Sequence, residues 1–161
     1  MKKALSILLL IAAPATASPE IVGAHGQWST LRSNTTCEAA SRTVNQSAPG
    51  AMPGKVSLSF DAGGPRRGQF STSLSLPRRA DSAVLLTIGG KRFLLLTDGN
   101  RAWSRGPAQE QAIMAAMRRS ERLRIEARTP AGGRIIDRYS LSGAPTAIDA
   151  AAACAARLAN R

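Results

Sequence analysis

Two pairs of neighbouring arginines are the side chains whose type and spacing best suit binding chemistry. Arg66 and Arg67 follow the turn-forming run Gly63-Gly64-Pro65, and Arg78 and Arg79 follow Pro77. A guanidinium group can donate two parallel hydrogen bonds to one carboxylate or phosphate. Because surface loops often carry function, these four arginines are predicted to bind an anion, with solvated turn charge as the alternative.

The groups that catalysis usually needs are scarce. A serine or cysteine nucleophile requires a neighbouring base. The single histidine, His25, lies near the N-terminus of the mature chain and could be a base only if that segment folds over a site; an exposed, non-catalytic side chain is the alternative. The sequence contains no Gly-x-Ser-x-Gly, His-Glu-x-x-His or phosphate-loop motif. One histidine and two distant cysteines do not supply the four ligands usual at a zinc site. The sequence therefore predicts no catalytic residue, no metal and no cofactor.

Carboxylates leave one enzymatic alternative. Two acidic side chains can perform acid–base chemistry without a histidine if they converge in a pocket. The aspartates lie mainly at turns or on polar strand faces, where turn and cap roles are usual: Asp61, Asp81, Asp98, Asp137 and Asp149. A small exported carboxylate-based hydrolase is therefore the alternative to a non-enzymatic binding protein.

Residues 1–17 have the composition of a secretory signal peptide. Lys2 and Lys3 give a positive start, residues 4–13 form an apolar run, and Ala15-Thr16-Ala17 has the small-x-small pattern of a cleavage site. The run is shorter than the roughly 20 apolar residues that span a bilayer; a buried N-terminal helix is the alternative. Cleavage after Ala17 is predicted, with a periplasmic or secreted product and no transmembrane segment.

The two cysteines are expected to form a disulfide. Cys37 and Cys154 are the only cysteines, and the exported compartment is oxidising. Two free thiols are the alternative, although neither cysteine has a neighbouring His or a CxxC partner that would make it reactive. Because the bond closes a loop of more than 100 residues, chain entropy gives a stabilisation of about 4–5 kcal/mol, with about 2–4 kcal/mol more typical.

Charge favours an anionic partner. Without the predicted leader, 144 residues keep 20 basic and 10 acidic side chains, a net charge of +10, and 18 of the 22 basic residues in the whole chain are arginine. Such a field attracts phosphate groups, acidic glycans and nucleic acid; solubility alone is the alternative. Only six aromatic residues are available, which disfavours base stacking and hence nucleic acid. A nucleic-acid coat is a third hypothesis, which predicts steep salt dependence.

Period-two alternation predicts that strands dominate the chain. Residues 18–26 are expected to form an irregular lead-in, Asn45 to Gly54 a loop and Gly89-Gly90 a tight hairpin turn. The more continuously apolar segments Val84 to Ile88 and Phe93 to Thr97 are typical of central strands. The remaining expected strands are 27–32, with Trp28 as an anchor, 36–44, 55–61, 70–76, a short one near 102–103, 122–128 and 135–141.

Two helices are expected. Pro107 suits a first helical turn and Arg118 a last one, which gives a helix of about three turns. Thr146 and Asp149 resemble a capping box before an Ala-rich helix that ends near Leu158. The pattern favours a mainly β fold, namely an antiparallel β-sandwich, jelly-roll-like, with one short crossover helix and a C-terminal Ala-rich helix. Residues 18–161 are expected to form one domain.

Several segments, in order, resemble the invasion-associated locus B family. Leu85–Phe93 resembles that family's hydrophobic strand, Ile-Asp-Gly turn and following strand, and Ile113–Ile125 resembles its short helix and next strand. Tyr139–Ala144 with the trailing helix is similar to its Ser-Leu-x-Gly-Phe ending, and Trp28 and Cys37 match its early Trp and Cys.

The chain departs from that family's pattern at three places. It has no cysteine pair between Thr97 and Ala102, Gly89 stands where the family has Asp, and Ala144 stands where the family has an aromatic residue. The resemblance implies an exported β-sandwich protein of alphaproteobacterial type, periplasmic or surface-associated; some members are linked with host-cell invasion. The expected function is therefore non-enzymatic binding of a protein, a glycan or an anionic envelope component.

Overall fold

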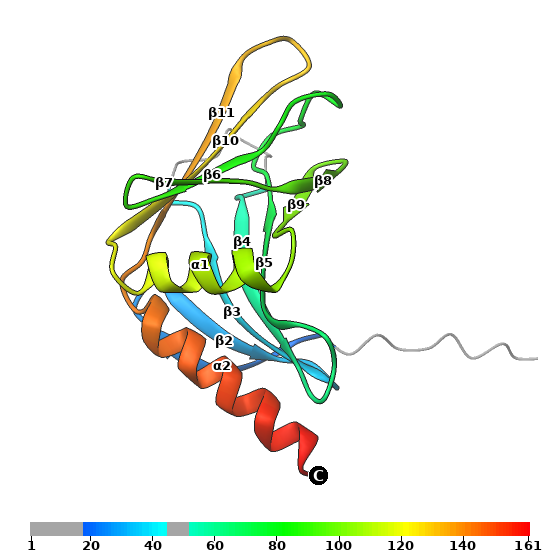
Figure 1. Cartoon of the computed structure of the whole chain (residues 1–161), viewed down its shortest axis with the longest axis vertical. Helices are drawn as coiled ribbons and strands as arrows, with labels where there is room; N and C mark the ends of the chain where they lie inside the picture. Colours follow the sequence, from blue (N-terminus) through cyan, green and yellow to red (C-terminus); the bar gives the residue numbers. More distant parts are fainter. Residues whose placement is uncertain (1–17, 45–51) are drawn as a thin grey trace, which may run out of the picture.

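The computed structural model describes residues 18–44 and 52–161. The predicted leader and most of the predicted loop from Asn45 to Gly54 lie outside these residues. In the described part the chain is mainly β, with two antiparallel sheets and two helices (Figure 1). The predicted fold class is therefore confirmed.

The larger sheet has seven strands among the described residues, and most neighbours in the sheet are also neighbours in the chain. In spatial order these strands are β1 (Glu20–His25), β2 (Trp28–Arg32), β3 (Thr36–Arg42), β4 (Lys55–Asp61), β5 (Arg67–Ser73), β9 (Arg101–Trp103) and β8 (Leu96–Asp98). Sequential antiparallel pairing follows from short turns between strands of alternating pattern.

The smaller sheet has four strands within residues 18–44 and 52–161. In spatial order they are β11 (Arg134–Ser140), β10 (Arg122–Arg128), β6 (Leu85–Ile88) and β7 (Lys91–Leu94). The predicted Gly89-Gly90 turn joins β6 to β7. The tip of the β10–β11 hairpin extends to the top of Figure 1.

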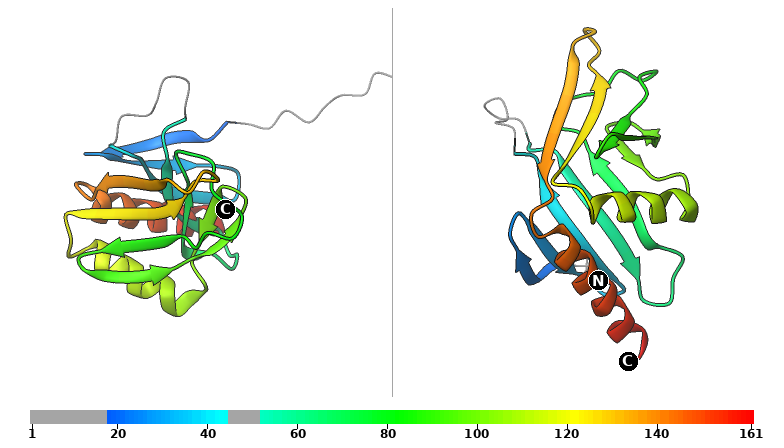
Figure 2. Two further views of the ribbon diagram at one scale, coloured as in Figure 1. Left: turned by 90° about the horizontal axis from the view of Figure 1, so that it is seen from above. Right: turned by 60° about the vertical axis from the view of Figure 1, so that its left-hand side comes forward.

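In Figure 1 α1 (Pro107–Met117) crosses the middle of the molecule just below β7, and α2 (Ala144–Ala159) lies further down; Figure 2 shows the same helices from two other sides. α1 connects β9 of the larger sheet to β10 of the smaller one, as a crossover helix should, and packs mainly on β5. α2 packs mainly on β2 and β3. One side of the larger sheet is therefore covered partly by strands and partly by helices.

A single hydrophobic core joins these layers. Leu58 and Phe70 of the larger sheet, Leu86 and Ile125 of the smaller sheet and Ile148 of α2 belong to one buried cluster. Their positions follow the alternation that the sequence shows, because every second strand residue faces the same side. The outward side of the smaller sheet carries mostly polar and charged residues, together with Ile136, Leu85 and Leu94.

Two long-range links join the first described strands to the C-terminal part of the chain. Cys37 on β3 and Cys154 on α2 form the predicted disulfide, with their Cα atoms 6.0 Å apart, and both residues are buried. Trp28, the predicted anchor, is also buried and donates a hydrogen bond of 2.9 Å from Nε1 to the backbone oxygen of Ser140. The first strands are thereby held to both the last strand and the last helix.

Three local predictions were wrong. The lead-in is not irregular, because residues 20–25 pair with β2 as an edge strand. The segment from Phe93 to Thr97 is not one central strand but the end of β7 and the start of β8, which lie at the edges of different sheets with buried Leu95 between them. α2 begins at Ala144, before the expected capping box, and Asp149 binds Arg118 instead.

Candidate functional site: an arginine face on the smaller sheet

The outward side of the smaller sheet is strongly basic. Leu123, Ile125 and Ala127 of β10 point to the core, so the residues between them point outward. In the described strands, this side carries one acidic residue, Glu126, and six arginines. We call this surface the arginine face, and its arginines are Arg92, Arg122, Arg124, Arg128, Arg134 and Arg138.

Strand pairing arranges the face in four cross-strand rows. The first row holds Ser140 and Arg122. The second row runs across all four strands, and the third contains Glu126 among apolar side chains. The members of the second row are Arg138, Arg124, Thr87 and Arg92; those of the third are Ile136, Glu126, Leu85 and Leu94; and those of the fourth are Arg134 and Arg128.

This arrangement places like charges directly opposite one another. Arg124 pairs with Arg138, and Arg128 pairs with Arg134. Like charges at opposite positions of neighbouring strands are destabilising. Glu126 relieves part of this repulsion, because its carboxylate lies 3.1 Å from Arg124 and 2.8 Å from Arg134. The face nevertheless keeps a net charge of five positive units.

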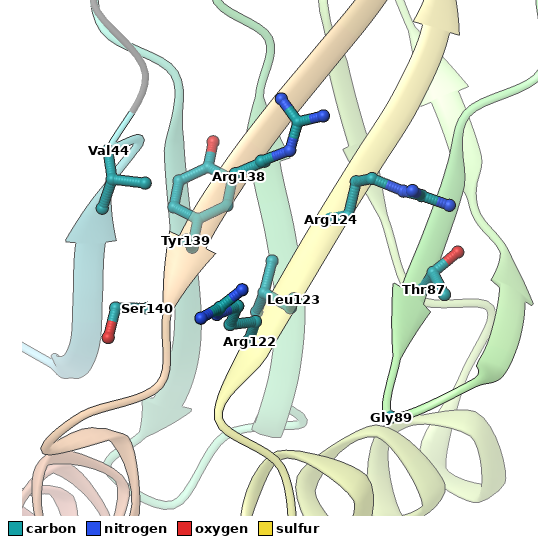
Figure 3. A pocket seen from close by; sticks show the side chains of 9 residues that line it. All are labelled: Val44, Thr87, Gly89, Arg122, Leu123, Arg124, Arg138, Tyr139 and Ser140. Atoms are coloured by element: carbon teal, nitrogen blue, oxygen red, sulfur yellow. The ribbon is translucent and has the colours of Figure 1, made fainter.

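A groove of about 480 Å³ lies at the first two rows (Figure 3). Arg122, Arg124 and Arg138 line it from β10 and β11, and no acidic residue is among the described residues of its lining. The side chains of Leu123 and Tyr139, which also line it, are buried, so main chain forms part of its floor.

One polar atom in this groove lacks a partner. The Oγ1 atom of Thr87 is buried, and within the described structure it neither donates nor accepts a hydrogen bond. Register places Thr87 between Arg124 and Arg92 in the second row. An unpaired buried hydroxyl costs about 1–3 kcal/mol, so a ligand or a water molecule that reached this atom would recover that cost.

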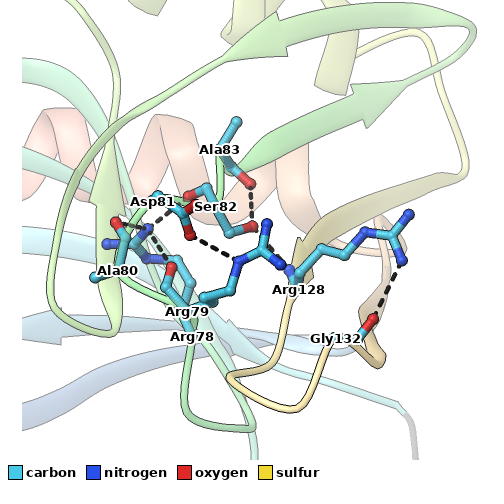
Figure 4. Close-up of polar contacts among 8 residues, drawn as sticks. All are labelled: Arg78, Arg79, Ala80, Asp81, Ser82, Ala83, Arg128 and Gly132. Atoms are coloured by element: carbon cyan, nitrogen blue, oxygen red, sulfur yellow. Dashed lines mark hydrogen bonds and ion pairs between the residues drawn. The ribbon is translucent and has the colours of Figure 1, made fainter.

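A second groove of about 470 Å³ lies at the other end of the face. Its charged lining combines four arginines with two acids, namely Arg79, Arg92, Arg128, Arg134, Asp81 and Glu126. Figure 4 shows the polar contacts of the loop before β6: the backbone nitrogen of Arg128 donates to Ser82 Oγ at 2.9 Å, and Arg79 binds Asp81 at 2.7 Å. The loop is therefore attached to the end of β10.

The predicted pair Arg66 and Arg67 lies far from the arginine face, on the β4–β5 hairpin at the bottom of Figure 1. Arg66 contacts Asp61 at 2.7 Å and donates to Thr36 Oγ1 at 3.1 Å. The hydrogen bond from Arg66 is the largest cause that holds the pKa of Asp61 below its usual value. Arg66 therefore has a clear structural role in its own turn, while Arg67 is exposed.

The predicted pair Arg78 and Arg79 behaves differently. Arg78 donates to four backbone carbonyl groups in and beside its loop, including those of Gly99 and Ser82. Arg79 is nearly half exposed and lines the second groove. The structure thus separates the two predicted pairs to opposite ends of the molecule and brings only Arg79 to the arginine face.

The carboxylates of the described chain mostly contact basic or hydroxyl side chains. Glu20, Glu38, Asp61, Asp81, Glu126 and Asp149 each form an ion pair with an arginine or lysine. Two further acids are buried: Ser104 Oγ donates to Glu110, and the backbone and side chain of Ser75 both donate to Asp137. Each of these eight carboxylates therefore has a basic or hydroxyl partner.

Asp137 also influences its neighbour on β11. Burial, and next the charge of Asp137, raise the pKa of Tyr139 above its usual value. Gly54 packs against both groups, because a Cβ atom there would lie 2.7 Å from the Tyr139 hydroxyl and 2.8 Å from Asp137. This polar cluster lies inside the sandwich, on the opposite side of the sheet from the arginine face.

Comparisons of this chain with protein-family models, with curated proteins and with solved structures find no match. In the part that the structure describes, neither helix is long and apolar enough to cross a membrane. Within the same residues, no group of three or more His, Cys, Asp or Glu side chains could hold a metal ion. The fold and the arginine face are therefore the features from which a function has to be argued.

The arginine face was missed by sequence reasoning, although its signal is visible. Arg122, Arg124, Glu126 and Arg128 alternate with the apolar residues Leu123, Ile125 and Ala127, and Arg134 and Arg138 lie an even number of residues apart after the turn. Period-two alternation predicts that such residues share one side. The basic surface is found by counting the arginines on one side of two paired strands together, rather than by looking for adjacent arginines in loops.

Proposed function

We propose that this protein is an exported, non-enzymatic binding protein of the periplasm or cell surface, whose arginine face binds an anionic envelope component. The observation that carries the proposal is the concentration of six arginines with one acidic residue on the outward side of four described strands. A surface of one sign attracts ligands of the opposite sign and raises their local concentration.

The cost of the face supports a binding role. Arginines placed opposite one another on β10 and β11 lower the stability of the sheet. An anion that binds the folded state offsets this cost and stabilises the fold by mass action. A charge placed only for solubility would do better on helices or loops, where residues of like sign can stay apart.

Export is supported by three observations of different kinds. The leader pattern of residues 1–17 fits a signal peptide, and the Cys37–Cys154 disulfide is compatible with an oxidising compartment. The resemblance to the invasion-associated locus B family points to the same compartment. Mass spectrometry of the protein exported by a bacterial host, with and without a reductant, tests the first two together. We expect a chain that begins at Ser18 and is lighter by two hydrogen atoms than its reduced form.

Binding to dextran sulfate, a generic polyanion, tests the role of the face. We expect the double variant Arg122→Gln/Arg138→Gln to elute from an immobilised column at clearly lower salt than the wild type. The matched control is Arg119→Gln/Arg157→Gln, which removes the same charge from exposed positions outside the face. Removal of each arginine that contacts the polymer should reduce the slope of log K against the logarithm of the salt concentration by about one unit. Equal elution of the two variants would refute the proposal.

The loop arginines are tested in the same assay. Arg79 lines the second groove and Arg67 does not, so Arg79→Gln should weaken binding whereas Arg67→Gln should leave it close to wild type. Variants of Arg66 and Arg78 are less informative, because both side chains hold their own loops. A loss caused by Arg67→Gln alone would move the binding surface to the β4–β5 hairpin.

A further inference from the structure

The geometry points to a particular ligand class for the arginine face: a saccharide that carries a phosphate group at each end, as in the headgroup of a bis-phosphorylated envelope glycolipid. This inference rests on the proposed function and narrows it from any anion to one chemical form. It depends on two arginine clusters, on the row between them and on the hydroxyl groups in the first groove.

The charges form two clusters rather than one even field. The first cluster is Arg122, Arg124 and Arg138 at the first groove, and the second is Arg92, Arg128 and Arg134 at the second groove. Arg124 and Arg128 are four residues apart on β10, which corresponds to about 13 Å along a strand. A ligand that engages both clusters needs two anionic groups at about this separation, and a disaccharide phosphorylated at both ends has them.

The chemistry of each cluster suits phosphate better than carboxylate. A phosphate monoester carries a charge of about −1.5 to −2 and three acceptor oxygens, whereas a carboxylate carries one charge and two oxygens. Three guanidinium groups offer more donors and more charge than one carboxylate can use. No acidic residue is among the described lining of the first groove, whereas Asp81 and Glu126 line the second, so the first groove is the stronger of the two candidate phosphate sites. Arg124 of the first cluster shares the Glu126 carboxylate with Arg134 of the second.

The third row lies between the first cluster and two members of the second, Arg128 and Arg134, and it suits a sugar ring. Glu126 lies there between Ile136 and Leu85, its pairing partners on either side. A carboxylate accepts hydrogen bonds from ligand hydroxyl groups, and it keeps free acceptor positions beside its two arginines. The apolar side chains can pack against the C–H groups of a ring, and Leu94 extends this row at 45% exposure.

Hydroxyl groups complete the first groove. Ser140 and Thr87 both line it, and Thr87 Oγ1 has no hydrogen-bond partner in the described structure. A saccharide phosphate brings ester oxygens and neighbouring hydroxyl groups, which can pair with such side chains when the arginines above them move onto the phosphate.

Calorimetric titration with three defined probes tests the inference. The probes are a glucosamine disaccharide with phosphate at both ends, the same disaccharide with one phosphate, and the unphosphorylated sugar. For the wild-type protein we expect the bisphosphate to bind about tenfold or more tightly than the monophosphate, because the second phosphate gains charge-assisted hydrogen bonds. The unphosphorylated sugar should show no measurable binding.

Matched variants test the two clusters separately. Arg122→Gln/Arg138→Gln and Arg92→Gln/Arg128→Gln each remove two charges from one cluster, and Arg119→Gln/Arg157→Gln removes two charges elsewhere. Each cluster variant should lower the affinity for the bisphosphate to about that of the monophosphate, while the control stays within about threefold of wild type. Thermal unfolding of each variant checks that it is folded; we expect the two cluster variants to be no less stable, since cross-strand repulsion decreases.

The possible failures are distinct. If dextran sulfate binds through the face but the bisphosphate binds no better than the monophosphate, the two-phosphate inference is wrong and the general proposal stands. If cluster variants and control weaken bisphosphate binding equally, only net charge matters and the inference is again wrong. If no anionic probe binds, both proposals are wrong.

Discussion

Glu126→Gln should change stability and polyanion binding in opposite directions. Glu126 is the acidic residue of the arginine face in the described strands, and its carboxylate bridges Arg124 and Arg134 at 3.1 and 2.8 Å. The amide keeps the shape of the side chain but removes its charge. The net charge of the face therefore rises from five to six positive units, while two attractive contacts are lost.

The size of the stability loss follows from the exposure of the partners. Arg124 and Arg134 have side chains 45% and 61% exposed, so each pair belongs to the class of exposed ion pairs, worth about 0.2–1 kcal/mol. The opposed arginines of β10 and β11 also lose their screening charge. We expect a decrease of about 1–2 kcal/mol in the free energy of unfolding, or roughly 3–6 °C in Tm.

The control is Glu38→Gln, which makes the same chemical change on the larger sheet. Glu38 forms a single ion pair, with Lys55 at 3.3 Å, and lies outside the arginine face. Urea and thermal denaturation at low salt give the stabilities, and elution from dextran sulfate gives binding. Glu126→Gln should unfold earlier yet elute at higher salt than the wild type, whereas Glu38→Gln should show a smaller loss of stability and no comparable gain in binding.

Two outcomes would refute this reasoning. If Glu126→Gln elutes earlier than the wild type, the carboxylate organises the arginines rather than opposing the ligand. If the loss of stability of each variant is the same at low salt as at 0.5 M salt, the electrostatic account is wrong. At 0.5 M salt the Debye length is about 4 Å, so interactions between exposed charges are largely screened.

Three further predictions concern the fold. Changing Cys37 and Cys154 together to Ala opens a loop with a sequence separation of 117 residues and should lower the free energy of unfolding in urea by about 2–5 kcal/mol; each single Ala variant should be destabilised too. Gly143→Ala should cost about 3 kcal/mol or more, because the new Cβ would lie 1.8 Å from a backbone oxygen of β1, whereas Gly63→Ala, at a similar positive φ but in open space, should cost about 1 kcal/mol. Asp61→Asn should cost about 1 kcal/mol at pH 7, and since its arginine partner lowers the folded-state pKa of Asp61 below 3.8, the difference from wild type should shrink as pH falls through that lowered value.

Each of these has a clear contrary result. A double cysteine variant as stable as the wild type would mean that the loop is already ordered without the bond. Equal costs at the two glycines would mean that left-handed strain, rather than the close approach at Gly143, sets the penalty. A stability difference for Asp61→Asn that persists unchanged in acid would exclude the charge of that carboxylate as its cause.

The parts of the fold that could be predicted are those with a strong local period. Val56, Leu58 and Phe60 alternate with polar residues, and the structure buries all three on β4. The same rule placed β10 and β11, terminal signals such as Pro107 placed α1, and the redox argument placed the disulfide. In each case local preference and tertiary packing agree, which is the condition under which sequence reasoning works.

The failures have a physical cause as well. Ile21 and Val22 are exposed at 68% and 41%, so β1 has no buried face to give it an alternating pattern, and its pairing with β2 cannot be inferred from burial. The strand expected from Phe93 to Thr97 changes sheets at Leu95, which a run of leucines does not reveal. Both are edge strands, and edge positions carry the weakest sequence signal.

The candidate site was only partly predictable. The excess of arginine predicts an anionic partner, and the loop pairs were predicted to bind it. In the structure Arg66 and Arg78 mostly support their own turns. The face arises from residues that are two apart in sequence and opposite in register, such as Arg124 and Arg138. Register depends on which strands pair, and that information is not present in either strand alone.

The change of sheet at Leu95 limits how the arginine face can change in evolution, because it couples the register of β7 to that of β8. Leu95 is buried, and its nitrogen donates to the backbone oxygen of Val84 at 3.1 Å, so β7 cannot slide along β6 without disturbing β8 in the other sheet. A slip of one residue in β10 would also turn its arginines into the core. The strand register therefore fixes the distance between the charged rows. Ligand preference can be altered by exchanging side chains at alternate positions, but not by gradual shifts of the backbone.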